Sequence, residues 1–278
     1  MTLAISGATG FVGAYLTKYF QDKGYFVIAL SRSIINNHEL LKEQLSDADI
    51  VINLAGASII KRWSKAYKKV LFNSRIETTK ALVHAIKALE NPPTFLSTSA
   101  IGIYKKDARY DEETTEFSEG FLSQLCQDWE AEALKADTRV AILRFSVILG
   151  PGGALHKMLT PFKLGLGGPI GSGKQAFSFI HINDLARAYE HIIKDVRLHG
   201  LFNMSTPYFC NNLELTQKLA KKLKRPAFLS LPVFVLKLIF GEGSQTLTEG
   251  ESVYPKRLLE SGFSFEYTEL EDVLDDLL

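Results

Sequence analysis

Three glycines at a regular spacing are the residues of this chain whose chemistry is easiest to assign. The apolar run 3–5 leads into a turn with Gly7, Gly10 and Gly13, and a stretch with helical periodicity follows. Gly7 permits a tight turn, Gly10 lets the backbone approach a pyrophosphate, and Gly13 lets the helix pack closely on the strand. The helix N-terminus then presents free N–H groups to phosphates. The pattern predicts a dinucleotide site with contacts from Gly7, Thr9, Gly10, Phe11, Val12 and Gly13.

The end of the second apolar run indicates which dinucleotide to expect. Residues 25–30 are followed by Ser31, Arg32 and Ser33. An acidic residue at this point hydrogen-bonds the ribose 2′-hydroxyl of NAD, whereas an arginine accommodates the 2′-phosphate of NADP. The acid is missing and Arg32 is present, so we predict that these three residues surround the phosphate of NADP(H), in preference to NAD(H). The alternative is a solvated surface arginine.

A turn of small residues follows residues 49–53, which are expected to form a strand. Leu54, Ala55 and Gly56 stand at the carboxyl end of that run. Open α/β sheets bind ligands at the carboxyl ends of their strands, where small residues let a cofactor lie against the backbone. We expect all three to contact the cofactor, with a simple close-packed turn as the alternative.

A cluster of hydroxyl side chains ends the run 94–98. Ser97, Thr98 and Ser99 are followed by Tyr104. Together with the glycine spacing, the cluster resembles the extended short-chain dehydrogenase/reductases. That resemblance implies a Ser or Thr that polarises a substrate hydroxyl or carbonyl and a tyrosine that lines the pocket. Ser99 is the first candidate, Thr98 is the second and also a cofactor contact, and Tyr104 is the pocket tyrosine. Alternatively, Ser97 and Thr98 satisfy backbone groups at a strand end.

The tyrosine and lysine that this family places four residues apart on the next helix are missing. Residues 120–132 contain neither type. A tyrosine with its ordinary pKa of about 10 needs a nearby cation to act at neutral pH, so a substrate alcohol lacks its usual base. Three candidates for the missing base stay open. They are Tyr104 beside Lys105 and Lys106, a carboxylate of Asp128 or Glu130, and a water held by Ser99.

Further segments extend the resemblance to atypical, epimerase-like members of the NAD-dependent epimerase/dehydratase superfamily that carry a C-terminal domain of unknown function. These segments are 53–57, 75–82, 97–104, 126–130, 144–155, 164–175, 179–185 and 229–278. The resemblance implies hydride transfer on a small polar substrate, for example a nucleotide-linked sugar, and adds Arg75 to the cofactor contacts. The alternative is a non-catalytic NADP(H)-binding protein that senses redox state or docks a partner. A homo-oligomer formed through 64–89 is compatible with both.

Two other places offer polar groups to a substrate. Arg144 ends the run 139–144 at the same sheet edge, and Lys174 and Gln175 end the glycine-rich loop 165–175. Glycines expose backbone N–H groups and Lys174 adds a positive charge, so this loop can wrap a phosphate. We expect Arg144, Lys174 and Gln175 to contact substrate. The alternatives are a buried ion pair for Arg144 and a mobile lid for the loop. His181 is interpreted as a structural, hydrogen-bonded histidine.

The composition limits the kinds of partner. The 278 residues are 46% hydrophobic and 23% charged, and the formal net charge of +1 gives no electrostatic argument for nucleic acid or an anionic membrane. Two cysteines, Cys126 and Cys210, and no basic segment ahead of the first strand favour a cytoplasmic protein. The apolar stretch 229–240 is too short to span a bilayer and predicts a packed helix. The histidines show no metal-ligand spacing, so no metal is expected.

These residues require a scaffold of alternating strands and helices. Strands are expected at 3–5, 25–30, 49–53, 94–98 and 139–144, and a long helical region at 64–89. This order predicts an α/β fold, a Rossmann-type doubly wound parallel sheet with a smaller C-terminal substrate lobe. Residues 1–150 form the expected NADP-binding domain, which also receives segments around 176–204. Residues 151–278 form mainly the lobe, with 229–278 resembling the family's C-terminal domain.

Overall fold

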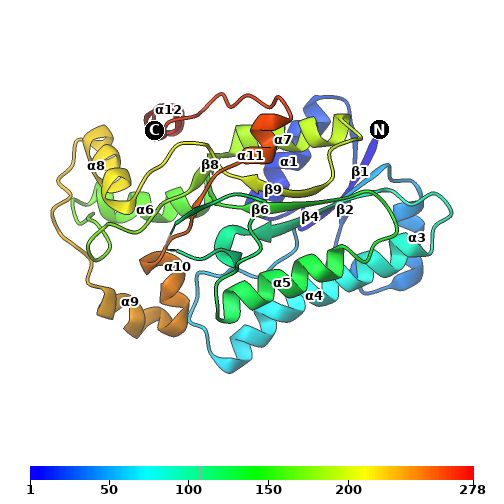
Figure 1. Cartoon of the computed structure of the whole chain (residues 1–278), viewed down its shortest axis with the longest axis horizontal. Helices are drawn as coiled ribbons and strands as arrows, with labels where there is room; N and C mark the ends of the chain where they lie inside the picture. Colours follow the sequence, from blue (N-terminus) through cyan, green and yellow to red (C-terminus); the bar gives the residue numbers. More distant parts are fainter. Residues whose placement is uncertain (107) are drawn as a thin grey trace.

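A parallel sheet forms the centre of the protein in the computed structural model, which describes residues 1–106 and 108–278. Six strands pair in the order β2-β1-β3-β4-β6-β9, and each pairing is parallel (Figure 1). The strands are β1 (Thr2–Ser6), β2 (Phe26–Leu30), β3 (Ile50–Asn53), β4 (Thr94–Ala100), β6 (Val140–Phe145) and β9 (Gly200–Met204). The expected Rossmann-type fold class is therefore confirmed.

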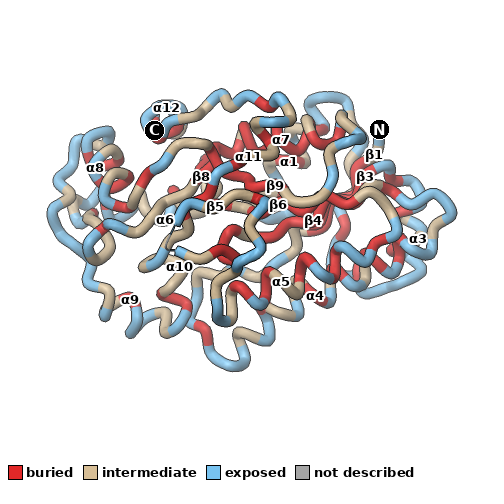
Figure 2. The backbone as a smooth tube through the Cα atoms, in the orientation of Figure 1, coloured by how far each residue is buried: buried red, intermediate tan, exposed pale blue. Residues whose placement is uncertain are grey.

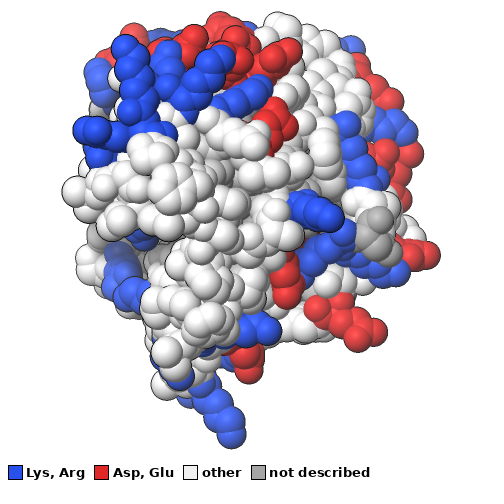
Figure 3. All heavy atoms as spheres, turned by 90° about the vertical axis from the view of Figure 1, so that its left-hand side faces the viewer, with Lys and Arg blue, Asp and Glu red and all other residues white. Residues whose placement is uncertain are grey.

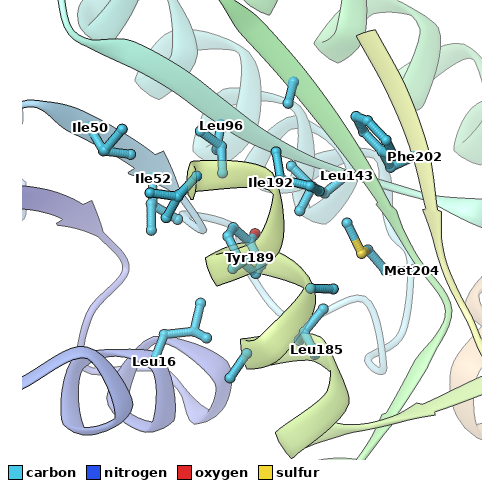
Figure 4. Packing of buried hydrophobic residues seen from close by; sticks show 14 of the residues in the cluster. Leu16, Ile50, Ile52, Leu96, Leu143, Leu185, Tyr189, Ile192, Phe202 and Met204 are labelled. Carbon is cyan, nitrogen blue, oxygen red and sulfur yellow. The ribbon is translucent and has the colours of Figure 1, made fainter. Parts of the chain in front are cut away.

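Alternate residues of each strand face two helical layers. Leu3 and Ile5 of β1 pack with α1 (Phe11–Asp22) and α7 (Ile182–Lys194), whereas Ala4 packs with the opposite layer. That opposite layer contains α2 (Arg32–Ile35), α3 (His38–Ser46), α4 (Lys65–Lys87) and α5 (Phe121–Ala133). Figure 4 shows Tyr189 of α7 in the first layer, among side chains from the strands and from α1. Both sheet faces are covered, so the central strands are buried (Figure 2).

A smaller lobe lies at the left of Figure 1 and has an apolar cluster of its own. Leu155, Phe162, Leu215 and Leu270 belong to this cluster. α11 (Lys256–Glu260) packs on the central sheet through Leu258. The other described elements, which form the lobe and its connections to the sheet, are η1 (Ile101–Ile103), β5 (Arg109–Tyr110), β7 (Val147–Leu149), α6 (Gly153–Lys163), β8 (Phe179–His181), α8 (Asn212–Leu223), α9 (Val233–Phe240), η2 (Gly241–Ser244), α10 (Gln245–Thr248), β10 (Ser252–Val253) and α12 (Leu270–Leu277).

The stretch 229–240 corrects one expectation. A helix, α9, forms there. Of the α9 residues that the structure describes, Leu236 alone is buried. Phe234 and Leu238 are 70% and 73% exposed. The helix therefore presents much of its apolar surface to the outside, where a packed helix was expected. Within residues 1–106 and 108–278, no helix combines the length and apolarity needed to cross a bilayer.

The strand order positions the ligand site. β2 lies on one side of β1, and the chain then crosses to the other side of β1 to form β3, so the direction in which strands are added reverses at β1. Ligands of open α/β sheets bind in the crevice that such a reversal opens at the carboxyl ends of the strands. The turns after β1 and β3 are therefore the places at which to look for a cofactor site.

Candidate functional site

The turn after β1 leaves the N-terminus of α1 open. Gly7 has a φ of +72°, and a Cβ on Gly13 would lie 2.1 Å from the Gly7 carbonyl oxygen, so both positions require glycine. Gly10 is the exposed N-cap residue, and no described side chain caps the helix or places an acid in its first turn. The first N–H groups of α1 are therefore available to an anionic ligand.

A cavity of about 500 Å³ begins at this turn and follows the carboxyl ends of β1, β3 and β4. The sequence-predicted residues that line it are Gly7, Gly10, Phe11, Val12, Gly13, Leu54, Gly56, Arg75, Thr98 and Ser99. Apolar side chains such as Ile59, Leu122 and Trp129 form another part of its wall. The structure thus brings the glycine turn and the hydroxyl cluster into one space, whose volume is typical of small-molecule sites.

Other predicted residues lie outside this cavity. They are Thr9, Ser31, Arg32, Ser33, Ala55, Tyr104, Arg144, Lys174 and Gln175. Arg32 is exposed at the start of α2, directly after β2. The Ser31 hydroxyl accepts a hydrogen bond from the Ile34 N–H at 3.3 Å and lies 2.7 Å from the Ser33 hydroxyl. Arg32 therefore stands at the sheet edge where an adenosine ribose is read in this type of fold.

The loop that carries Lys174 and Gln175 packs on the lobe. Lys174 is exposed and lines a separate surface hollow with Arg109. The Gln175 side-chain amide donates to the Ile170 carbonyl oxygen at 3.2 Å. The Gly171 N–H donates to the Leu231 carbonyl oxygen at 2.9 Å. The structure therefore does not bring these two side chains to the hydroxyl cluster.

Arg144 lies in a buried ion pair. It is 1% exposed, and its Nε and Nη2 donate to the two carboxylate oxygens of Glu130 at 2.8 and 2.7 Å. Its Nη1 donates to the Tyr104 hydroxyl at 2.7 Å, and that hydroxyl donates to Asn203 Oδ1 at 2.8 Å. Burial raises the pKa of Tyr104 to about 12 although Arg144 acts to lower it. The Tyr104 hydroxyl is thus protonated at neutral pH and hydrogen-bonded inside the protein.

The Ser99 hydroxyl connects this ion pair to the cavity. Its Oγ donates to Glu130 Oε1 at 2.6 Å, and Ser99 also lines the cavity. A hydroxyl has one proton to donate and two lone pairs that accept. Because that proton is directed at Glu130, Ser99 presents acceptor lone pairs to a ligand. It can receive a hydrogen bond from a substrate hydroxyl in this arrangement.

Cys126 and Glu130 are site residues whose arrangement sequence reasoning missed. They lie four residues apart on α5, the spacing at which a tyrosine and a lysine are expected from the dehydrogenase/reductase resemblance. Cys126 lines the cavity, and burial raises the pKa of its thiol to about 12, so it is not a thiolate at neutral pH. The spacing was readable in the sequence, but the ion pair that holds Glu130 was not.

Arg75 brings a positive charge from α4 to the cavity wall. Its Nη1 and Nη2 donate to the carbonyl oxygens of Leu71 and Ala57 at 3.2 and 3.1 Å. The guanidinium carbon lies 5.3 Å from the centre of the Trp129 ring. Burial lowers the pKa of Arg75, and no carboxylate of the described chain forms an ion pair with it. Its remaining N–H groups are therefore available for a negatively charged or carbonyl oxygen.

The lobe adds a carboxyl group to the same space. Glu251 lines the cavity, and burial raises the pKa of its carboxyl although the nearby Lys106 acts to lower it. Lys106 itself forms an ion pair with Glu249. Asp128, one of the bases left open, accepts a hydrogen bond from the Gln124 amide at 2.8 Å and does not line the cavity.

Comparisons with known proteins show which family this chain resembles. The model of the NAD dependent epimerase/dehydratase family matches residues 3–204, and that of a domain of unknown function, DUF1731, matches residues 231–277. The epimerase family protein SDR39U1 of Homo sapiens is 38% identical over 292 residues, with 100% of both chains covered. A homolog from Arabidopsis thaliana, described as chloroplastic, is 34% identical over 297 residues, covering 99% of this chain and 86% of the relative.

A solved structure has nearly the same fold. The crystal structure of human epimerase family protein SDR39U1 (isoform 2) with NADPH superposes with a TM-score of 0.93 at 36% sequence identity. The match covers 100% of this chain and 99% of that chain.

Because the Arabidopsis thaliana relative is described as chloroplastic, the expected cytoplasmic location stays a prediction.

Proposed function

The chain belongs to the NAD-dependent epimerase/dehydratase family, and on that premise we propose that it is an NADP(H)-dependent oxidoreductase acting on a small alcohol or carbonyl compound. One observation carries the proposal. The uncapped N-terminus of α1 and the Ser99 hydroxyl open into the same cavity. A cofactor held at the first would extend toward a substrate oxygen held at the second.

The residues of the turn fit a pyrophosphate. Gly10 has no side chain to occupy the space in front of the first N–H groups of α1, and no acid in the first turn of this described helix repels an anion. Arg32 would meet the 2′-phosphate, and Leu54 and Gly56 would lie along the ribose side. When bound, NADP(H) supplies the hydride donor or acceptor. The NADPH in the human relative's structure supports this choice of dinucleotide.

The other end of the cavity would receive the substrate. Ser99 offers lone pairs to a substrate hydroxyl, and Arg75 offers N–H groups to a carbonyl or carboxylate oxygen. The cationic lining residues of the described chain are Arg75 and Lys106, and Lys106 pairs with Glu249. This supports a compact, partly apolar substrate more than a nucleotide-linked sugar, whose diphosphate would need further cations.

Reduction of a carbonyl group requires a proton as well as a hydride, and we assign Glu251 as the proton donor. Of the two glutamates that line the cavity, Glu119 is exposed whereas Glu251 is partly buried. Burial raises the pKa of the Glu251 carboxyl, which favours a proton that can be given to a substrate oxygen directly or through one water. Tyr104 and Glu130 are less suitable because their polar atoms are engaged within the buried network.

A non-catalytic NADP(H)-binding protein is the second candidate. The observation that favours it is the pair Cys126 and Glu130 at the expected tyrosine–lysine spacing. Glu130 is the anionic member of an ion pair with Arg144, and an anion does not lower the pKa of a neighbouring acid as a lysine would. A protein of this kind would bind NADPH and report its concentration without turnover.

Calorimetric titration of nucleotide-free protein with NADPH and with NADH is the first test. We expect NADPH to bind at least ~10-fold more tightly, the lower end of what one charge-assisted contact provides. NADPH fluorescence is then followed while aldehydes and ketones that carry a hydroxyl group next to the carbonyl are added one at a time, because Ser99 offers acceptors to a substrate hydroxyl. Fluorescence decay that is lost in Ser99→Ala and in Glu251→Gln supports the oxidoreductase.

Ser123→Ala is the matched control, because Ser123 lines the same cavity but donates to the Ile103 carbonyl oxygen at 3.1 Å. Fluorescence decay that persists unchanged in Ser99→Ala rules out the role assigned to Ser99. NADPH binding without decay for any compound favours the non-catalytic candidate. Binding of neither nucleotide overturns both.

A further inference from the structure

An exposed apolar patch covers part of the lobe surface. It comprises Leu164, Leu166, Phe228, Phe234, Leu238 and Ile239. These residues come from α9, from the end of α6 and its following loop, and from the segment before α9. Phe228, Phe234 and Leu238 are each at least 70% exposed. Contiguous exposed surface of this type usually marks a place where a protein meets a partner or a membrane.

Hydrogen bonds to the backbone hold the segments that carry the patch. The Leu231 N–H donates to the Pro169 carbonyl oxygen at 2.8 Å, which joins the two loops that carry Leu166 and Phe228. On the other side, Arg62 Nη1 donates to the Leu238 carbonyl oxygen at 2.6 Å. The Trp63 N–H donates to the Phe240 carbonyl oxygen at 3.2 Å. The exposed side chains are thus held on hydrogen-bonded segments on both sides of α9.

The charges around the patch are mostly positive. Every Asp, Glu, Lys or Arg within the ranges 50–76, 150–183 and 215–241 is a Lys or Arg. Lys68, Lys218 and Lys222 form ion pairs with Glu242, Glu214 and Asp275. Within residues 1–106 and 108–278, no acid forms an ion pair with Lys163, Arg225 or Lys237. Figure 3 shows a broad uncharged area on this side of the molecule, with Lys and Arg along its upper left, left and lower margins and Asp and Glu above it and at its lower right. The net charge of +1 does not reveal that positive charges gather around this patch.

We propose that this face is a peripheral membrane-binding surface for anionic lipid. Phe234 and Leu238 would enter between the head groups, while Lys237 and the surrounding cations would contact lipid phosphates. Apolar insertion and attraction to anionic lipid act together at such surfaces, and neither requires a membrane-spanning helix. The expectation of no membrane partner rested on the net charge, and the local charge distribution argues for the opposite.

A second copy of the chain fits this face less well. A two-fold contact brings the same surface of both copies together. Arg225, Lys237 and their basic neighbours would then face identical cations across the interface. The acids next to this segment in sequence, Glu214 and Glu242, already pair with Lys218 and Lys68. An anionic surface neutralises those charges and covers the apolar side chains at the same time.

Co-sedimentation with vesicles tests the proposal. The full chain is mixed with vesicles of phosphatidylcholine alone and with vesicles of equal parts phosphatidylcholine and phosphatidylglycerol. We expect binding to the anionic vesicles, weaker binding at high salt, and an affinity at least ~10-fold lower for the double variant Phe234→Ser/Leu238→Ser. Lys237→Glu with Arg225→Glu should weaken binding as well, because it replaces attraction with repulsion.

A matched control separates this surface from exposed apolar residues in general. Phe26 and Val196 are 70% and 74% exposed and lie outside the patch, so Phe26→Ser/Val196→Ser should bind vesicles as the parent does. The melting temperature of each variant, measured without vesicles, confirms that it is folded. Equal binding to neutral vesicles, or no binding, overturns the proposal. A dimer in solution that Phe234→Ser/Leu238→Ser converts to monomer overturns it in favour of a second copy.

Discussion

Glu130 and Arg144 are joined by two hydrogen bonds of 2.8 and 2.7 Å, and the same carboxylate accepts the Ser99 proton at 2.6 Å. The pair links α5 to β6 across the floor of the site. Arg144 also holds the Tyr104 hydroxyl, so a single buried cation organises both hydroxyl groups that the sequence singled out. Removing either charge would leave the other buried and unpaired.

Replacing Glu130 with Gln should therefore be costly. We expect Glu130→Gln to lower the free energy of unfolding by about 3–5 kcal/mol, as measured by urea denaturation, because Arg144 keeps its charge in a buried site. Glu77→Gln on α4 is the control. Glu77 and its partner Lys80 are 55% and 50% exposed, so the loss should be below ~1 kcal/mol. Equal losses in the two variants would contradict the role assigned to the pair.

The sheet could be predicted from the sequence because its signals are local. Apolar runs bounded by turn residues marked five of the six strands, and their ends differ from the observed bounds by no more than two residues. α9 shows where such signals fail. Apolar composition predicts burial, but whether a helix packs depends on which surfaces the rest of the chain leaves uncovered.

The candidate site could be predicted only in part, for a similar reason. The glycine turn and Ser99 share a cavity because consecutive parallel strands end at one edge. Tyr104 and Arg144 come from the same edge, yet their polar groups meet Asn203 and Glu130 inside the protein. Pairwise burial of this kind depends on side-chain packing between segments far apart in the chain, which spacing alone does not encode.

Gly10 offers a test of the phosphate site that spares the fold. Its φ of −73° and ψ of 170° suit any residue, and an added Cβ would lie 3.2 Å from the Gly7 carbonyl oxygen. Gly10→Ala should therefore keep a near-parental melting temperature but bind NADPH at least ~10-fold more weakly, because the methyl group keeps the pyrophosphate from the backbone. Titration calorimetry measures the affinity.

Gly13→Ala is the comparison variant for Gly10→Ala. Its Cβ would lie 2.1 Å from the Gly7 carbonyl oxygen, so this substitution should lower the melting temperature itself. Undiminished NADPH affinity in Gly10→Ala would argue against a pyrophosphate at this turn.

Arg32 should set the preference between the two dinucleotides. It is exposed at the start of α2, and its charge is the feature that distinguishes this position from one reading an NAD ribose. Arg32→Ala should reduce the ratio of NADPH to NADH affinity by roughly 10- to 100-fold, corresponding to one charge-assisted contact. Lys42→Ala, which removes a partly exposed cation on α3, should leave the ratio unchanged. An unchanged ratio in Arg32→Ala would identify a solvated surface arginine.

His181 should make stability depend on pH. Its Nδ1 accepts the Asn183 N–H at 3.2 Å at the start of α7, and its Nε2 lies 3.2 Å from Asp276 Oδ2. Burial lowers the pKa of His181, although Asp276, Asp184 and Glu266 act to raise it. The unfolded chain therefore binds a proton more readily than the folded protein does. This contribution to stability should be present above the ordinary histidine pKa of about 6.5 and decline as the pH falls below it.

Urea unfolding at several pH values between neutral and mildly acidic conditions measures this dependence. His181→Gln should flatten the decline, because the titrating ring is gone while a side-chain acceptor remains for the Asn183 N–H. Asp276→Asn removes a carboxylate that acts to raise the pKa of His181, so the decline should become steeper. A decline in His181→Gln as large as in the parent would place the responsible proton on another group.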